Sequence, residues 1–330
     1  AAAIAYYEAF GCRVGERGEL DAAAARRLYG VDSALLSVRL LHQQADHGLV
    51  RLMQWERPCN EGLGLGANLR CVGSRWGVRV AASVLEIVNH AQRAREAGEP
   101  LTLIEPLLAV IGEVSGVRAA RPFRDPIVGV REMVLLQPLY RQVFFERFNY
   151  ASPAYGQVNP DCLLRTSQHT HFGLMIADDD PQVLDFYDQV LGLQRTFDER
   201  TPWDNATGSR VIFGLQPGEG FHMVDFDDPR TGRALADRRS GKLKCVRFAA
   251  GARIDDLRIR SRAGSLGYSL YVWRVGDVEA MQRRVAAAGA RQVGDVVRDE
   301  FGRRGFTFDA PDGYQWMLIG ATDAPQTSSR

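Results

Sequence analysis

The feature that most constrains this sequence is a helical segment closed by glycine, which recurs four times along the chain. The closing glycines are Gly11, Gly98, Gly192 and Gly289. A glycine after the last turn of a helix adopts the left-handed backbone that ends helices at little steric cost. Strand-like runs follow each helix. This periodicity predicts one supersecondary unit used four times.

The four helices are predicted over residues 4–10, 83–97, 181–191 and 278–288. Ser83 followed by Glu86 forms a capping box, and Asp277 caps the last helix. Asp180 before Pro181 supplies a cap acceptor and a proline at the first helical position. Apolar residues recur at helical spacing in the third and fourth segments.

A short strand is predicted before each of the last three helices, over residues 75–80, 171–176 and 270–275. After each helix, a final apolar run closes the unit. These closing runs begin at Gly48, Gly129, Gly220 and Gly313. The unit is therefore βαβββ, and the fold class is α+β. The first copy begins inside its helix, so we expect its opening strand to precede Ala1.

The four units divide the chain into halves. We expect an N-terminal module pair over residues 1–138, without its first strand, and a C-terminal pair over 166–330 that carries the candidate site. The segment 139–165 is rich in phenylalanine and tyrosine and is too apolar for a free linker. We expect it to be a connector packed across the two halves.

Composition excludes several classes of function. The 41 basic and 40 acidic residues give a net charge of +1, which argues against nucleic acid as a partner. No apolar run is long enough for a transmembrane helix, so no membrane association is expected. Five widely spaced cysteines without a CxxC pair favour a reducing compartment, and the predicted location is the cytoplasm.

Two motifs resemble a known family. The first is His171-Phe-Gly-Leu-Met-Ile-Ala-Asp178, followed by Phe186-Tyr187 and Leu191-Gly192. The second is the segment 308–319, where a Pro-Asp-Gly turn precedes a final apolar strand. Together they are similar to modules of the vicinal oxygen chelate superfamily, which includes glyoxalase I, bleomycin resistance proteins and extradiol dioxygenases. The resemblance covers the C-terminal half well and the N-terminal half in outline.

The resemblance implies two module pairs, each curled into a U-shaped mixed sheet with helices outside and a site on the concave face. In metal-dependent members, histidines of opening strands and glutamates of closing strands hold a divalent metal there. A catalytic metal needs an open coordination position for substrate oxygens.

This sequence departs from that metal-binding pattern. His171 stands at the first ligand position, but Leu270 and Met317 stand where the last module should supply ligands. His222 is the nearest polar residue of the third module's closing run, and Glu132 is a weaker candidate in the N-terminal pair. A divalent metal stays possible, but two histidines without a carboxylate make a poor iron or manganese site. The cofactor is therefore left unknown.

We predict a pocket in the C-terminal pair with His171 and His222 as catalytic residues. Strand alternation predicts an apolar lining, made by Met175, Val224, Val272 and Met317. The alternative for each histidine is a purely structural role on its strand. For Glu132 the alternative is a solvated strand residue.

Three functions remain open from the sequence. The first is an enzyme, of lyase, isomerase or dioxygenase type, that acts on a small apolar or aromatic molecule bearing oxygen, without the usual metal site. The second is a non-catalytic protein that binds or sequesters such a molecule, as resistance proteins do. The third is a metal-dependent ring-cleaving dioxygenase or lyase with divergent ligands. A homo-oligomer is possible.

Overall fold

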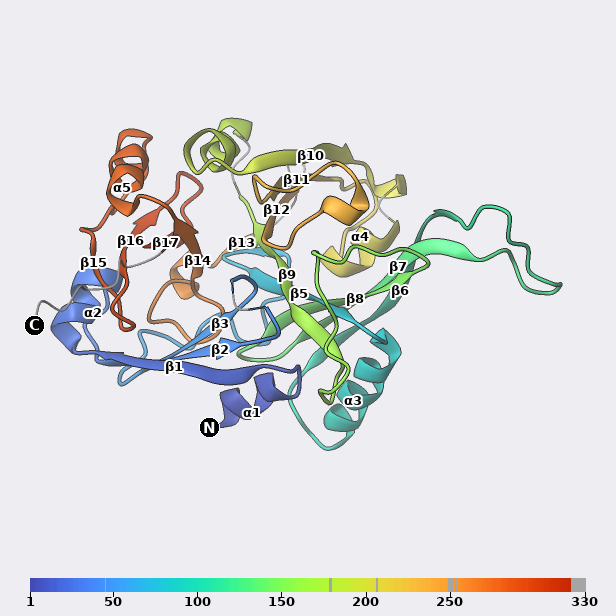
Figure 1. Cartoon of the computed structure of the whole chain (residues 1–330), viewed down its shortest axis with the longest axis horizontal. Coiled ribbons are helices and arrows are strands. Elements are labelled where there is room, and N and C mark those ends of the chain that lie inside the picture. The colour runs from blue at the N-terminus through green and yellow to red at the C-terminus, as the bar shows by residue number, and fades with distance from the viewer. Residues whose placement is uncertain (45, 178–179, 206, 249–251, 253, 322–330) are drawn as a thin grey trace, which may run out of the picture.

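The computed structural model describes residues 1–330 apart from 45, 178–179, 206, 249–251, 253 and 322–330 (Figure 1). Asp178 of the opening motif therefore lies outside the described residues. The described strands form an eight-stranded mixed sheet, separate three- and four-stranded sheets and a two-stranded ribbon, with helices on the outer sides. The predicted α+β class of four modules in two pairs is confirmed.

The modules share one strand order, in which the opening strand lies beside the closing strand. The first module comprises α1 (Ala2–Glu8), β1 (Arg13–Leu20), α2 (Ala22–Tyr29), β2 (Leu35–Leu41) and β3 (Val50–Trp55). The second comprises β5 (Arg75–Ala81), α3 (Val84–Glu96), β6 (Thr102–Glu113), β7 (Ile127–Leu136) and β8 (Arg141–Phe148).

The third module comprises β9 (Thr166–Met175), β10 (Gln194–Thr201), α4 (Thr207–Phe213), β11 (Phe221–Asp227) and β12 (Lys242–Phe248). The fourth comprises β14 (Tyr271–Val275), α5 (Val278–Ala287), β15 (Val297–Arg298), β16 (Arg304–Asp309) and β17 (Gln315–Gly320). Two short strands, β4 (Cys71–Val72) and β13 (Asp255–Asp256), pair in parallel between them.

The local signals in the sequence behave as predicted in most places. All four closing glycines have positive φ, from 78° to 92°. The Ser83 hydroxyl accepts a hydrogen bond from the Glu86 amide, and Asp277 caps α5 in the same way. The third predicted helix does not form as one α-helix. A 3₁₀ turn over Pro181–Leu184 and a π-helical turn over Phe186–Val190 replace it.

The pairing of modules differs from the prediction. β5 and β9 pair antiparallel, so the second and third modules form one eight-stranded sheet. The cause lies in two glycines at the seam. A Cβ on Gly173 would lie 1.9 Å from the Trp76 ring, and a Cβ on Gly77 would lie 2.6 Å from the His169 ring. Glycine at both positions lets the two strands approach with these large rings between them.

The first and fourth modules form the other pair. α2 of the first module packs against β15 and β16 of the fourth. Leu35 and Trp55 share a buried apolar cluster with Met317 and Ile319. The edges of β3 and β14 face a common cavity, and among the described residues no strand lies between them. The predicted division into pairs 1–138 and 166–330 is therefore wrong at the level of the sheets.

The predicted connector 139–165 is also partly wrong, because it contains β8, the closing strand of the second module. The runs after Gly129 and Gly220 are third strands of their modules, β7 and β11. Alternation explains the aromatic composition of β8. Phe144 packs in the cluster around α3, and Phe145 packs on the inner face of the eight-stranded sheet.

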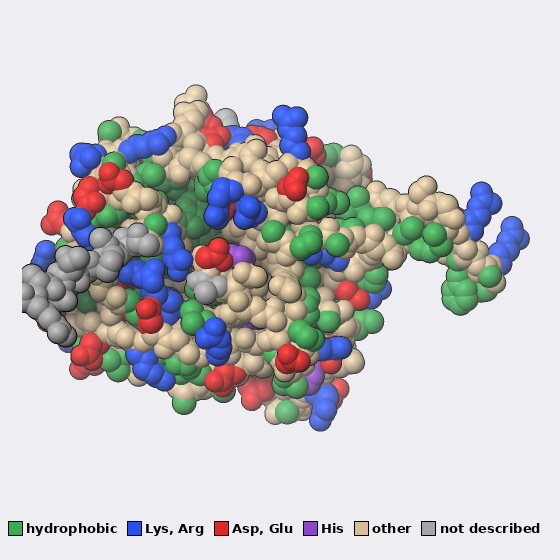
Figure 2. All heavy atoms as spheres, viewed as in Figure 1, with side chains coloured by type: hydrophobic (Ala, Val, Ile, Leu, Met, Phe, Trp, Pro, Cys, Tyr) green, Lys and Arg blue, Asp and Glu red, His purple; other side chains and the backbone are tan. Residues whose placement is uncertain are grey.

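The β6–β7 hairpin projects from the body as a long arm (Figures 1 and 2). Several of its large apolar side chains are exposed, namely Leu108, Val110, Ile111, Val117 and Phe123. No helix in the described part of the chain is long and apolar enough to span a membrane.

Candidate binding site

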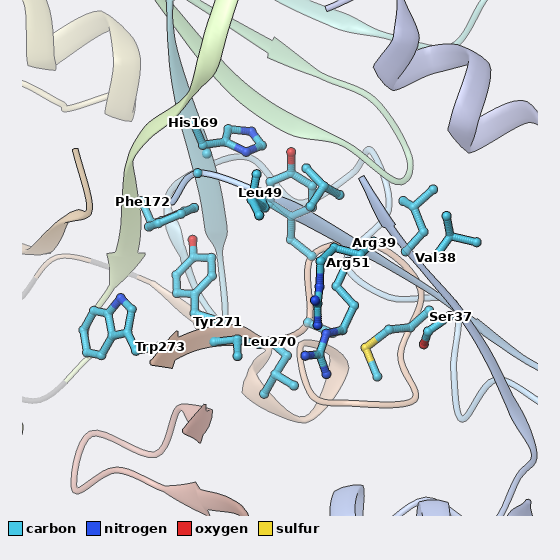
Figure 3. A pocket seen from close by; sticks show the side chains of 18 of the residues that line it. Ser37, Val38, Arg39, Leu49, Arg51, His169, Phe172, Leu270, Tyr271 and Trp273 are labelled. Carbon is cyan, nitrogen blue, oxygen red and sulfur yellow. The ribbon is translucent and has the colours of Figure 1, made fainter. Parts of the chain in front are cut away.

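A cavity of about 1230 Å³ lies between the eight-stranded sheet and the sheets of the first and fourth modules. One wall is the outer face of the β5–β9 seam, including His169 and Phe172. The edges of β3 and β14 form the opposite walls, and β2 closes one end (Figure 3). A volume of this size is ample for a small organic ligand, because typical ligand pockets measure about 300–1,000 Å³.

One side of the cavity is apolar and aromatic. Phe172, Leu270, Tyr271 and Trp273 lie together there (Figure 3). The Tyr271 hydroxyl lies 2.9 Å from the Trp76 carbonyl and 2.8 Å from the Gly173 carbonyl, so the ring is anchored to the seam. Trp273 stacks on a second tryptophan, Trp316, with ring centroids 4.4 Å apart. This side offers a preorganised surface for a planar apolar group.

The opposite end of the cavity is polar. Ser37 and Arg39 lie two residues apart on β2, so their side chains share one face of the strand. Ser37 is 1 % exposed and Arg39 is 7 % exposed. Within the described part of the chain, the Ser37 hydroxyl and the Arg39 Nη2 atom have no hydrogen-bond partner. Buried polar atoms usually have a partner in native proteins, so these two atoms have bonding capacity that a polar group of a ligand could satisfy.

Arg39 has partners on its other side. Its Nη1 atom forms an ion pair with Glu16, and its guanidinium lies 4.3 Å from the centre of the Phe301 ring. Burial lowers the pKa of Arg39, and the neighbouring Arg303 lowers it further. An anion beside Arg39 would therefore stabilise the charged guanidinium, which burial and Arg303 disfavour.

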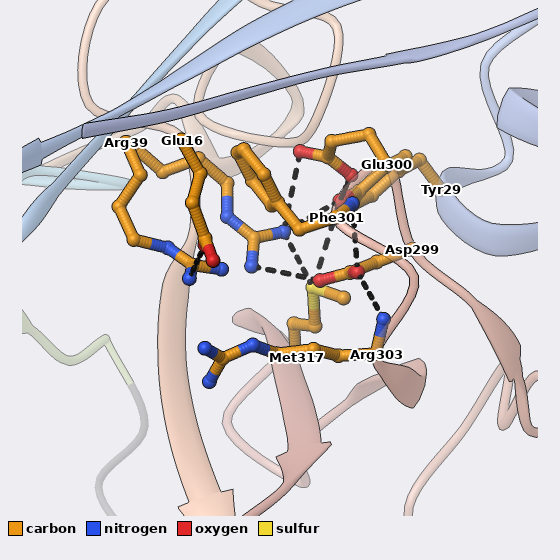
Figure 4. Close-up of polar contacts among 9 residues, drawn as sticks. Glu16, Tyr29, Arg39, Asp299, Glu300, Phe301, Arg303 and Met317 are labelled. Atoms are coloured by element: carbon orange, nitrogen blue, oxygen red, sulfur yellow. Dashed lines mark hydrogen bonds and ion pairs between the residues drawn. The ribbon is translucent and has the colours of Figure 1, made fainter. Parts of the chain in front are cut away.

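Arg51 sits on β3 directly opposite Arg39 in the strand register. Its Nη2 atom donates to Asp299 at 3.0 Å, and its Nη1 atom donates to the Tyr29 hydroxyl at 2.9 Å (Figure 4). Tyr29 in turn donates to Glu300 at 2.7 Å. Burial alone would lower the pKa of Arg51, but Tyr29, Glu300 and Asp299 outweigh burial and raise it. Arg51 is thus a charged structural link between the first and fourth modules.

His169 lines the far wall of the cavity and is 3 % exposed. Its Nε2 atom has no hydrogen-bond partner among the residues that the structure describes. Burial lowers the pKa of His169 well below its ordinary value, and the charge of Arg79 adds to the effect. The imidazole is therefore neutral near pH 7, and this nitrogen can donate or accept one hydrogen bond.

Comparisons with known proteins bear on this architecture. Residues 168–318 match the family model of the Glyoxalase/Bleomycin resistance protein/Dioxygenase superfamily. A Bacillus subtilis protein assigned as a dioxygenase shares the fold, with a TM-score of 0.51, 14% identity, and coverage of 97% of this chain and 80% of that one. The C-terminal half of this chain, residues 168–318, thus matches the superfamily that the sequence motifs resemble, and the solved structure shares the fold of the chain.

Weaker likenesses extend to other members of the superfamily. Glyoxalase I from Zea mays has a TM-score of 0.48 and 14% identity, with coverage of 97% of this chain and 87% of that one. A glyoxalase family protein from Bacillus cereus has 19% identity and a TM-score of 0.37, and covers 45% of this chain and 89% of its own. No curated protein matches the chain.

Many members of the superfamily hold a divalent metal, and the side chains that the structure describes offer no matching set of donors. Among the described residues, no group of three or more His, Cys, Asp or Glu side chains is arranged to hold a metal ion. The buried carboxylates of Asp299 and Glu300 are committed to Arg51 and Tyr29. We therefore derive no chemistry through a protein-held metal.

His171, the best sequence candidate, lies on the inner face of the eight-stranded sheet and outside the cavity. It pairs in register with Val78 and Lys242. Its Nδ1 atom lies 2.6 Å from the Tyr155 hydroxyl. Burial lowers the pKa of His171 strongly, and Lys244 and Lys242 lower it further. Its surroundings are thus those of a neutral histidine inside a packed sheet.

Glu132 lies on the same inner face, opposite Phe145 on β8. Burial raises the pKa of Glu132, and Lys244 partly opposes that change. The second and third modules thus bring His171 and Glu132 into one sheet, although the sequence placed them in different halves. Lys242 forms ion pairs with both Asp225 and Asp227 of the same sheet.

His222 lies on the outer face of the same sheet. Its Nε2 atom donates to Asp198 at 2.6 Å, and its Nδ1 atom accepts from Arg247 at 2.8 Å. Its register partner on β12 is Arg247, next to the inward-facing Val246. The prediction that His171 and His222 share one cavity is therefore wrong. The reason is that β11 is a third strand, whose faces were assigned as those of a closing strand.

The predicted lining residues divide among three places. Met175 packs on the inner face of the eight-stranded sheet, and Val224 packs in the outer cluster with the helical turns. Val272 and Met317 lie together between the first and fourth modules, and Val272 lines the cavity. The expectation of one pocket lined by all four residues is wrong.

Sequence reasoning missed Ser37, Arg39, Arg51 and the Asp299–Glu300 pair. One signal was present in the run Leu35-Leu-Ser-Val-Arg-Leu-Leu41, where two polar residues alternate within an apolar strand. Alternation of that kind places both polar side chains on one face. Nothing local could have indicated the contacts with Asp299 and Glu300, which come from the other end of the chain.

Proposed function

We propose that this protein binds a small, largely apolar or aromatic molecule bearing oxygen atoms in the cavity between its sheets. The observation that carries the proposal is the combination of a large aromatic-walled hollow with buried polar atoms, on Ser37, Arg39 and His169, that lack partners within the described residues. Ligand sites have this character, being mostly apolar with a few polar groups that fix orientation.

We propose that the ligand binds without a metal ion held by the protein. The described residues contain no three-donor group of the kind that a metal-dependent ring-cleaving or lyase mechanism needs. A binding or sequestering protein needs no such group. Cytoplasmic location and the homo-oligomer stay predictions.

The test is a cavity-filling substitution with a matched control. Leu270→Trp places a large ring in the cavity, whereas Leu108→Trp places one on the exposed arm. Binding of 1-naphthol, an aromatic oxygen-bearing probe, is measured by titration calorimetry. We expect Leu270→Trp to weaken binding by about tenfold or more, because overpacking excludes the ligand. Equal binding by both variants, or no binding by the wild type, would contradict the proposal.

A second candidate is catalysis on the bound molecule, with His169 as general base. The observation favouring it is a neutral, buried imidazole in the cavity wall, whose Nε2 atom has no partner among the described residues. A base of this kind contributes roughly 10²–10⁴-fold to a rate. In a screen for turnover, His169→Gln should abolish activity while affinity stays within about tenfold. If His169→Gln loses only affinity and no turnover is found, the binding function stands alone.

A further inference from the structure

The polar end of the cavity contains an arrangement that identifies a chemical class of ligand. On β2, Ser37 lies opposite Met53 of β3, and Arg39 lies opposite Arg51. Ser37, Arg39, Arg51 and Met53 all line the cavity. Figure 3 shows Ser37 and Arg39 on the same side of the hollow, across from the aromatic side chains of β14. A ligand that fills the hollow would touch both ends.

Ser37 and Arg39 each have a hydrogen-bond donor without a partner among the described residues. The Ser37 hydroxyl and Arg39 Nη2 are buried and lack partners within the part of the chain that the structure describes. Arg39 uses Nη1 for Glu16, its Nη2 atom has no partner among the described residues, and the residue lines the cavity. Native proteins seldom leave buried donors unsatisfied, so a group entering from the cavity should complete them.

The charged groups around these donors differ in how far they are buried. Arg51 is compensated by Asp299 and Glu300, whose side chains are fully buried. The ion pair of Arg39 is with Glu16, whose side chain is 57% exposed. Solvent screens that ion pair and leaves Arg39 partly uncompensated toward the cavity. Arg303 lies beside them and adds a further positive charge (Figure 4).

The number of the donors favours a carboxylate. One guanidinium N–H and one hydroxyl offer one donor to each oxygen of a carboxylate. A phosphate has more oxygens and would need further donors. Hydrogen bonds from a guanidinium to an anion are about twice as strong as neutral ones, so the charge of the ligand should matter.

We propose that Arg39 and Ser37 form a carboxylate subsite at the polar end of this cavity. The ligand is therefore an aromatic or apolar carboxylate, with its apolar body against Leu270, Tyr271 and Trp273 and its carboxylate on β2. The inference rests on the proposed function, because it concerns the same cavity.

The experiment compares two probes of the same shape, 1-naphthoate and 1-naphthamide, which differ in charge. Affinities are measured by titration calorimetry on the wild type, Arg39→Gln, Ser37→Ala and the control Arg304→Gln. Arg304 pairs with Glu279 and does not line the cavity. We expect the wild type to bind naphthoate about tenfold or more tightly than naphthamide. Arg39→Gln should remove that preference, Ser37→Ala should reduce it, and Arg304→Gln should keep it.

Each other outcome has a definite meaning. Equal binding of both probes by the wild type overturns the carboxylate subsite and leaves the proposed function intact. A preference that survives in both Arg39→Gln and Ser37→Ala also overturns the subsite. An equal loss of both probes in Arg39→Gln means that Arg39 holds the fold, and this outcome overturns it as well. If neither probe binds the wild type, the proposed function fails and the subsite fails with it.

Discussion

The two pairs of modules in this protein are built from the same module and have different interiors. In the sheet of the second and third modules, the inner face is filled. Lys242 pairs with Asp225 and Asp227, and the Tyr155 hydroxyl meets His171. Beside the pair made by the first and fourth modules lies a cavity of about 1230 Å³, bordered by donors that lack partners among the described residues.

The difference teaches how a shared fold can separate stability from binding. Charges on the filled inner face compensate one another, and their removal should cost stability. Ser37 and Arg39 have unmet bonding capacity, and their removal should cost ligand affinity. Burial of polar atoms therefore has two meanings here, which differ in whether the residue lines the cavity.

The largest expected effect is on the filled sheet. Lys242→Met removes the cation that compensates two buried carboxylates and should lower the free energy of unfolding by about 3–5 kcal/mol. Lys244→Met is the matched control, because its ion pair with Asp225 is longer, at 3.7 Å. Urea unfolding measures both variants. If Lys244→Met is the more damaging change, Lys242 is not the cation on which the two carboxylates depend.

The next effect is a dependence of stability on pH. Both the cavity wall and the filled sheet should contribute to it, because each contains a buried histidine. Burial lowers the pKa of both His169 and His171 well below 6.5. Below pH 6.5 the unfolded chain therefore takes up protons that the folded chain does not. Stability should be fully present above pH 6.5 and fall on acidification, by up to about 1.4 kcal/mol per pH unit for each histidine.

Single substitutions can separate these two contributions. His169→Gln and His171→Gln should each flatten the fall in unfolding free energy between pH 6.5 and pH 5. His90→Gln, at an exposed position on α3, should leave it unchanged. Slopes equal to that of the wild type in both variants would show that neither imidazole stays neutral in the folded protein. Bound ligand should alter the slope through His169 alone.

The smallest effect concerns one hydrogen bond in the filled sheet. Tyr155→Phe removes the hydroxyl that lies 2.6 Å from His171 and should lower the free energy of unfolding by about 1 kcal/mol. A double-mutant cycle with His171→Phe measures the coupling between them. Additive effects would mean that the contact contributes nothing specific. Affinity for ligands of the cavity should not change.

The sequence alone was sufficient to predict the module and its local geometry. Glycines with positive φ, the Ser83 cap and strand alternation all depend on residues close in the chain, and all appear as predicted. Alternation correctly separated Phe172 and Leu174 from Met175. Such features follow from local sterics and hydrogen bonding, which a short window of sequence contains.

The sequence was not sufficient for the partnership of modules. Neighbouring modules were expected to pair as first with second and third with fourth. The decisive contacts were instead the approach of Trp76 to Gly173 and the packing of α2 on β16. Both depend on residues far apart in the chain. The same error affected the predicted site. The expected pocket combined Met175 of the eight-stranded sheet with Met317 of the fourth module, and the two residues pack in different clusters.

The pairing of the first and fourth modules has a consequence for the order in which the protein forms during synthesis. The eight-stranded sheet is complete once Phe248 has been made. The Tyr29 hydroxyl meets its partner Glu300 across 271 positions of the chain. Contacts of such long range form slowly, because the intervening chain must first be ordered. The first module should therefore leave the ribosome unpaired and wait, with the apolar side chains of β2 and β3 open to chaperones, until the fourth module arrives to build the cavity.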